Sequence, residues 1–204
     1  MTPYTKGLHE IGTGLYAYLL PDGSWGWSNA GLITSGEQSM LVDTLMTLDL
    51  TRDMLDTMAG RVPAAKSFDT LVNSHADPDH IWGNQLVGNA QIVATQAAAE
   101  DFSGYTPEGV TALKTDTPGI TGEFFERIFG PFDFSGIEVT MPTKTFTGEL
   151  TVNVGDKVVE LYDVGPAHSR GDLIVHLPGD KVAFVADLMF VGGHPVIWAE
   201  PVGN

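Results

Sequence analysis

Residues 71–80 read Leu-Val-Asn-Ser-His-Ala-Asp-Pro-Asp-His, and this stretch decides how the rest of the chain is interpreted. An apolar strand is expected to run into a turn that holds two histidines and two carboxylates within six residues. Imidazole nitrogens and carboxylate oxygens gathered at the end of a strand are suitable ligands for a divalent metal. The pattern therefore predicts a metal site at this turn, with further ligands supplied from elsewhere in the chain.

The same residues also have a purely structural interpretation. Asp77 followed by Pro78 is typical of a helix start, with aspartate as the N-cap and proline at the first helical position. Asp79 would then interact only with the positive end of the helix dipole. On this alternative the carboxylates cap a helix and the histidines hold no metal, so matching ligands elsewhere in the chain are needed to decide.

The spacing His-x-Asp-x-Asp-His, carried by His75, Asp77, Asp79 and His80, resembles the His-x-His-x-Asp-His signature of the metallo-β-lactamase superfamily. Most of its members are metal-dependent hydrolases. Asp77 stands where most members have a second histidine, although the flavodiiron proteins, which are di-iron oxygen and nitric oxide reductases, have a carboxylate there. The resemblance implies an α/β fold of the αββα sandwich type.

Two later stretches are similar to the remaining ligand motifs of the superfamily. Residues 165–169 read Gly-Pro-Ala-His-Ser after a predicted strand, which is similar to the Gly-x-x-His-Ser/Thr motif with its metal-binding histidine. Residues 184–187 form a Phe-x-x-Asp ending, which is similar to that of the aspartate that bridges two metals. The resemblance implies two ligand sets: His75, Asp77 and His168 for a first metal, and Asp79, His80 and Asp187 for a second.

The resemblance also implies the chemistry and the cofactors. One or two divalent metals are expected, with zinc as the usual ion. Iron or manganese are alternatives, because the carboxylate oxygen of Asp77 is a harder ligand than an imidazole nitrogen and favours harder cations. Two such cations share a water, lower its pKa and supply hydroxide for hydrolysis of an ester, thioester, lactone or β-lactam amide. Asp79 is the predicted catalytic residue, since it can steer this water or shuttle its proton.

Two other functions stay open. A di-iron redox enzyme similar to the flavodiiron proteins would explain Asp77, but those proteins carry a flavin domain that this sequence lacks. A non-catalytic domain that kept the fold would explain why no histidine after Asp187 stands in the usual context of the superfamily's last Gly-His motif. His194, in Gly192-Gly193-His194-Pro195, is not interpreted as the matching residue.

The composition is that of a single globular domain over residues 1–204, with 43% hydrophobic residues and no apolar run long enough to span a membrane. The formal charge of −16 disfavours nucleic acid as a partner and leaves a small-molecule substrate. No cysteine is present, so metal ligands must be His, Asp or Glu. No signal peptide is visible and a cytoplasmic location is expected, although a leader removed beforehand would leave the same N-terminus.

Alternating strand and helix patterns predict a layered α/β architecture. Strands are expected at 15–20, 30–34, 40–42, 70–72, 91–94, 145–152, 157–164, 173–175 and 182–185, with helices over 50–60, 79–87 and 96–102. Asp43 ends the predicted strand at 40–42, and the resemblance implies that it supports the metal site without binding the metal; the alternative is an ordinary turn aspartate.

Residues 103–142 differ in composition from the rest of the chain, because they mix glycines, prolines and aromatic residues. We interpret them as an insertion with one or two helices that caps the metal site, and the alternative is that its aromatic residues only pack it onto the body. Phe129 of this insertion and His194 near the C-terminus are the predicted substrate-binding residues. His9 and His176 are interpreted as structural or surface residues.

Only 17 residues follow Asp187 (204 − 187 = 17). The second helical layer of the αββα sandwich is therefore expected to be incomplete. A sheet left half covered exposes apolar surface, which predicts a homo-oligomer.

Overall fold

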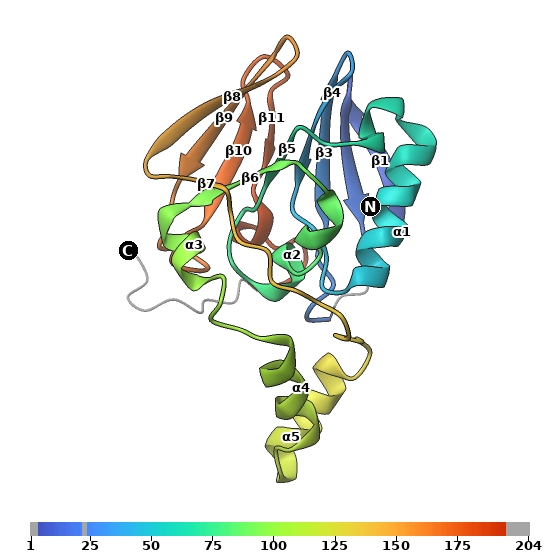
Figure 1. The fold of residues 1–204 in the computed structure, drawn as a ribbon, viewed down its shortest axis with the longest axis vertical. Helices are drawn as coiled ribbons and strands as arrows, with labels where there is room; N and C mark the ends of the chain where they lie inside the picture. The colour runs from blue at the N-terminus through green and yellow to red at the C-terminus, as the bar shows by residue number, and fades with distance from the viewer. Residues whose placement is uncertain (1–3, 22–23, 195–204) are drawn as a thin grey trace.

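Two β-sheets face each other in the computed structural model, which describes residues 4–21 and 24–194 (Figure 1). The first sheet contains seven strands in chain order: β1 (Gly7–Gly12), β2 (Leu15–Leu19), β3 (Ala30–Ser35), β4 (Gln38–Val42), β5 (Thr70–Val72), β6 (Gln91–Thr95) and β7 (Lys144–Phe146). Pairing is antiparallel from β1 to β4 and parallel from β4 to β7. The C-terminal ends of the four parallel strands therefore lie along one edge of the sheet.

The helical segments are α1 (Leu48–Arg61), η1 (Pro63–Lys66), α2 (Pro78–Ile81), η2 (Asn84–Val87), α3 (Gln96–Asp101), α4 (Pro107–Thr115), α5 (Gly119–Phe129) and η3 (Ala186–Leu188). Helix α1 begins where the hydroxyl of Thr47 accepts a hydrogen bond from the backbone N–H of Leu50, which caps the helix. Its buried residues, among them Met54 and Met58, pack on the first sheet and form one part of the core.

The second sheet has the strand order β11-β10-β9-β8 and is antiparallel throughout. Its strands are β8 (Glu149–Val154), β9 (Lys157–Asp163), β10 (Leu173–Leu177) and β11 (Val182–Phe184). Side chains from both sheets, such as Val72 and Leu161, interlock to form the core between them. The backbone N–H of Leu173 donates to the carbonyl of Ser74, so a main-chain hydrogen bond to a residue within 71–80 also joins the two sheets.

The α/β sandwich predicted from the sequence is confirmed. Side chains of β9 alternate between the two faces of its sheet. Val159 and Leu161 are buried toward the first sheet, whereas Val158 points outward and is 47% exposed. No helix within residues 4–21 and 24–194 lies over the outer face of the second sheet (Figure 1). The described residues place no helix on this face, and an incomplete second helical layer stays a prediction.

Three elements differ from the sequence-based expectation. The strand expected at 145–152 is two strands, because the chain turns at Gly148, with φ of 72°, and crosses from the first sheet to the second. The helix expected at 79–87 is interrupted, since the backbone N–H of Gly83 donates to the hydroxyl of Thr44 instead of continuing the helical ladder. Strand β1 was not expected at all.

Residues 103–142 contain α4 and α5, which extend from the end of the sandwich at which α2 lies (Figure 1). Phe132 and Phe134 are buried and pack against Trp27 and Trp82 of the body. These two aromatic residues therefore anchor the insertion, while its role as a cap stays a prediction. None of the helices in the described part of the chain is both long and apolar enough to cross a membrane.

Candidate metal centre

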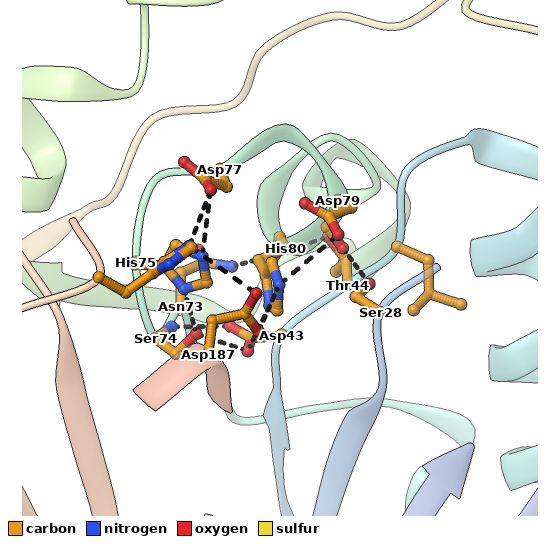
Figure 2. A network of polar contacts seen from close by, with 12 residues as sticks. Ser28, Asp43, Thr44, Asn73, Ser74, His75, Asp77, Asp79, His80 and Asp187 are labelled. Atoms are coloured by element: carbon orange, nitrogen blue, oxygen red, sulfur yellow. Dashed lines mark hydrogen bonds and ion pairs between the residues drawn. The ribbon is translucent and has the colours of Figure 1, made fainter. Parts of the chain in front are cut away.

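Six of the side chains proposed from the sequence meet at the C-terminal edge of the parallel strands. The turn after β5 supplies His75, Asp77, Asp79 and His80; the loop after β9 supplies His168; and η3 after β11 supplies Asp187. Figure 2 shows the side chains of the β5 turn and Asp187 directed toward one another. All three histidines are at most 4% exposed.

The first group consists of His75, Asp77 and His168, whose nearest ligand atoms all lie within 4.8 Å of one another. Asp77 Oδ2 lies 3.1 Å from His168 Nε2 and 3.6 Å from His75 Nε2. This is the set expected for the first metal. Its members come from two different sheets, so the group forms only when the sheets pack.

The second group consists of His75, His80 and Asp187. Asp187 faces both groups, since its Oδ1 lies 3.4 Å from His80 Nε2 and its Oδ2 lies 3.7 Å from His168 Nε2. Asp79 Oδ2 lies 3.8 Å from His80 Nε2, but Asp79 belongs to neither group. The structure therefore brings together only part of the expected second set: His80 and Asp187 group with His75, and Asp79 lies outside this group.

The donor set fits a divalent metal by two observations. The Nε2 atoms of His75 and His80 are buried and have no hydrogen-bond partner among the described residues, although a buried polar atom normally has one. The ligand-atom separations of 3.1–3.8 Å around them are also close to the edge of a tetrahedron of zinc ligands, about 3.3 Å for bonds of about 2.0 Å. A cation would supply the missing partner of both imidazoles.

Asp43 sets the orientation of both imidazole rings. Its carboxylate can only accept, so His80 Nδ1–H donates to Asp43 Oδ2 at 3.0 Å and the Ser74 hydroxyl donates to the same oxygen at 2.7 Å. Because the single hydroxyl proton of Ser74 is used there, the contact of 2.9 Å between Ser74 Oγ and His75 Nδ1 requires that the ring donates. In the neutral form that binds a metal, both rings would therefore carry their proton on Nδ1 and keep the Nε2 lone pair for the metal.

Asp43 thus has the supporting position expected from the sequence. It also accepts from the backbone N–H of Ser74 at 2.7 Å, and it is 2% exposed. Its φ of 64° lies in the left-handed region, which turns the chain sharply after β4.

A buried polar network holds the main chain of His80. Asn73 Nδ2 donates to the carbonyl of His80 at 2.9 Å, the amide of Asn84 donates to Asn73 Oδ1 at 2.9 Å, and the Thr44 hydroxyl lies 3.2 Å from the same carbonyl. The carbonyl that the interrupted helix leaves without a helical partner is satisfied in this way.

The charges of the centre stabilise one another. Burial alone would raise the pKa of Asp77, but the hydrogen bond with His168 and the contact with His75 outweigh it and hold this pKa well below its usual range. Burial would likewise raise the pKa of Asp187, but the charges of His80, His75 and His168 hold it at about 2.

At His80 the neighbouring charges again outweigh burial, whereas at Asp79 burial prevails. Burial would lower the pKa of His80, but the carboxylates of Asp79, Asp187 and Asp43 raise it well above its ordinary value. Burial raises the pKa of Asp79. The carboxylates thus favour a positive charge at His80, and a divalent cation would satisfy the same field.

The helix-cap interpretation of Asp77 does not explain its side chain. Asp77 has the backbone conformation of an N-cap before Pro78, but its carboxylate makes no capping hydrogen bond. The carboxylate is directed to His75 and His168 instead.

The two predicted substrate-binding residues lie outside these groups. Phe129 stacks on Phe125, with ring centroids 6.1 Å apart, and meets the edge of Phe134 inside the insertion. His194 is exposed in the segment after Gly193. Substrate contacts of both residues stay predictions. His9 and His176 lie elsewhere, hydrogen-bonded to Thr5 and Glu160 respectively.

Sequence reasoning assigned no role to Ser74 or Ser28. Ser74 links Asp43 to His75, and its place directly before the first histidine was the available signal. Ser28 lies in the loop between β2 and β3, and its hydroxyl donates to the carbonyl of Asp79. No local pattern pointed to that contact.

Comparison with known proteins agrees with the motifs. The sequence profile of the metallo-beta-lactamase superfamily matches residues 23–203. No curated protein matches the chain.

Several solved structures share the fold. A double mutant of the sec-alkyl sulfatase PisA1 superimposes with a TM-score of 0.68 at 20% identity, over 89% of this chain and 31% of that one. A metallo-beta-lactamase from Pontibacter korlensis superimposes with a TM-score of 0.63 at 17% identity, over 89% of this chain and 71% of that one. The stereoselective inverting sec-alkylsulfatase Pisa1 from Pseudomonas sp. superimposes with a TM-score of 0.62 at 19% identity, over 85% of this chain and 30% of that one. The chain thus spans about a third of the alkylsulfatases and most of the lactamase.

Proposed function

The chain belongs to the metallo-beta-lactamase superfamily, and from this premise we propose that it is a metal-dependent hydrolase acting on an ester, thioester, lactone or β-lactam amide bond. The observation that carries the proposal is the convergence of His75 and His80, whose buried Nε2 atoms have no hydrogen-bond partner among the described residues, with a third histidine and two carboxylates at one edge of the sandwich. Such a donor set, oriented from behind by Asp43, is what a catalytic metal site requires.

We assign His75, Asp77 and His168 to a first divalent cation, and His80 and Asp187 to a second, with Asp187 facing both. When bound, such cations act as Lewis acids toward the scissile bond and lower the pKa of water that contacts them. Asp43 and Ser74 hold the two imidazoles in the tautomer that directs Nε2 to the centre.

Asp79 is proposed to handle the proton of the attacking water. Its carboxylate lies beside His80 but outside both compact groups, which leaves it free to accept a proton at Oδ2. Burial raises its pKa, which brings it closer to the range of an effective general base. In the overall reaction, water adds to the carbonyl carbon, the bond to the leaving group breaks, and the proton passes to the leaving atom.

Metal analysis tests the proposal. Protein purified from media supplemented with zinc, iron and manganese is expected to hold one to two equivalents of metal. His75→Ala and His168→Ala are expected to lose it while circular dichroism stays native. His176→Ala is the matched control, since this histidine lies on the outer face of the second sheet and should keep the full metal content. Absence of metal from the unaltered protein would favour the non-catalytic alternative.

A di-iron redox enzyme is the second candidate, and Asp77 is the observation that favours it. A carboxylate oxygen beside His75 and His168 makes this group harder than one with three imidazoles. Two equivalents of iron together with oxygen consumption in the presence of a reduced flavin would favour this candidate over hydrolysis.

A further inference from the structure

We infer that the site takes a neutral ester-type substrate whose apolar acyl or alkyl group lies against Trp25, Phe124 and Ile120. These three residues are called the apolar wall below. The inference rests on the proposed hydrolytic function and narrows it to a class of substrate.

The apolar wall is exposed. Trp25 is 40% exposed, Phe124 is 45% exposed and Ile120 is 84% exposed. The rings of Trp25 and Phe124 meet edge to face with centroids 5.6 Å apart, so two segments distant in sequence form one surface. Ile120 lies four residues before Phe124 on α5 and therefore shares its face of the helix.

The apolar wall is close to the metal centre. The hydroxyl of Ser28 donates to the carbonyl of Asp79, and Trp25 precedes Ser28 by three residues, which span at most about 11 Å. Gly26, which follows Trp25, packs so closely on Phe132 that an added Cβ would lie 2.9 Å from the ring. This contact holds the loop between Trp25 and Ser28 in place. An acyl chain that leaves the centre along the Ser28 loop would therefore run toward Trp25 and Phe124.

A second apolar rim lies beside Asp187. The ring of Phe190 is 6.2 Å from the ring of His168, and its neighbours Met189 and Val191 are 67% and 74% exposed. Exposed large apolar side chains gathered around a polar centre are typical of a ligand-binding surface.

The charges around the centre favour a neutral substrate. The charged groups that act on Asp77, Asp79 and Asp187 are the histidines of the centre and the other carboxylates. All lysines and arginines lie in the described part of the chain, and none forms an ion pair with these three carboxylates. With no lysine or arginine paired to the centre, only the bound cations would attract an anionic substrate, and the formal charge of −16 opposes its approach.

The test compares chain length and charge on the metal-loaded protein. Hydrolysis of p-nitrophenyl acetate, butyrate and octanoate below their micelle concentrations is compared with that of p-nitrophenyl sulfate and phosphate. We expect kcat/KM to rise at least ten-fold from acetate to octanoate, because each additional methylene that is buried against the apolar wall strengthens binding. The anionic esters are expected to react at least a hundred-fold more slowly than the octanoate.

Substitutions in the apolar wall test whether these residues cause the dependence of kcat/KM on chain length. Phe124→Ala and Ile120→Ala are expected to reduce kcat/KM for octanoate several-fold and to flatten the dependence on chain length. Val158→Ala is the matched control, since Val158 is 47% exposed but lies on the outer face of the second sheet, and it should leave the profile unchanged. A flat profile in the unaltered protein, or faster hydrolysis of the sulfate, would overturn the inference while leaving metal-dependent hydrolysis intact.

Binding to the metal-free protein gives a readout that does not depend on catalysis. Saturation-transfer NMR with 2-decanone, a neutral ketone that cannot be hydrolysed, is expected to detect contact that Phe124→Ala weakens and Val158→Ala does not. Ketone binding without hydrolysis of any ester would support the apolar wall and contradict the proposed function. Equal ketone binding to all three proteins would contradict the wall.

Discussion

At the scale of single residues, the orientation of the imidazoles depends on one carboxylate. Asp43 accepts three hydrogen bonds, from the Ser74 hydroxyl, the Ser74 backbone N–H and His80 Nδ1. Asp43 belongs to neither ligand group. It nevertheless determines, directly for His80 and through Ser74 for His75, which ring nitrogen faces the centre. The ligands and the residue behind them therefore form one unit.

Asp43→Asn tests this role with little change of shape. Asparagine tolerates the left-handed backbone at this position, where φ is 64°. Its NH₂ group cannot accept, so one hydrogen bond is lost if this group replaces Oδ1 and two are lost if it replaces Oδ2. We expect metal affinity to fall about 10- to 100-fold, as for other residues that orient metal ligands. Competition with a chromophoric chelator measures the metal affinity. Asp69→Asn is the control, because the carboxylate of Asp69 accepts a hydrogen bond from the backbone N–H of Ser39 instead. An unchanged affinity would mean that Asp43 only shapes the turn.

Asp77 is the residue that separates this chain from the usual superfamily pattern. Its Oδ2 lies between His75 and His168, so Asp77→His would exchange an oxygen ligand for a nitrogen ligand within one group. We expect the ratio of zinc to iron or manganese bound to rise, because imidazole is the softer ligand. Elemental analysis after growth in a mixture of the three metals measures the ratio. The same ratio in both proteins would contradict the argument from ligand hardness.

At the scale of elements, the loop that carries His168 is held by the start of α3. The hydroxyl of Thr95 caps α3 by accepting from the backbone N–H of Ala98 and donates to the carbonyl of Gly171. A Cβ on Gly171 would meet the backbone nitrogen of Ala98 at 2.1 Å, so only glycine permits this approach. The position of His168 is therefore fixed by contact between an element of the first sheet and a loop of the second.

Gly171→Ala tests that contact. We expect the free energy of unfolding to fall by about 1–3 kcal/mol, as in other overpacked sites, and metal affinity to fall because the His168 loop must move. Urea denaturation and chelator competition measure the two effects. Gly179→Ala is the matched control, since a Cβ there has no atom within 4 Å, and it should alter neither quantity. Equal behaviour of the two variants would show that the loop accommodates the methyl group.

At the scale of the whole molecule, the ligands connect the two sheets. His75 and Asp77 follow a strand of the first sheet, while His168 and Asp187 follow strands of the second. A cation bound to both would link the halves of the sandwich, so metal binding and the stability of the fold are coupled.

Metal binding is accordingly expected to raise the melting temperature. At a free metal concentration of 100 times Kd, the native state gains about 2.7 kcal/mol, which corresponds to roughly 5–10 °C for a chain of this size. Differential scanning calorimetry of the protein with metal and with chelator measures the shift. His168→Ala should abolish most of it, and a full shift in that variant would place the metal elsewhere.

Self-association stays a prediction at this scale. The outer face of the second sheet carries Val158, which is 47% exposed, and no described helix lies over this face. Light scattering coupled to size exclusion would detect a dimer, and Val158→Glu is expected to dissociate it. A monomer at high concentration would contradict the prediction.

The sequence by itself determined the local features. The spacing of His75, Asp77, Asp79 and His80 is contained in one strand end and one helical turn, where backbone geometry alone fixes which side chains can converge. The alternation of strands and helices likewise determined the layered fold, because periodicity reports which face of each element is buried.

Only the tertiary structure decided the rest. Asp77 and His168 are 91 positions apart, and they meet because two sheets pack face to face. The same packing brings Asp187 between the two ligand groups, and the packing of the insertion brings Phe124 against Trp25. No local pattern carries such information, since contacts between distant segments depend on how whole layers bury their apolar faces against one another.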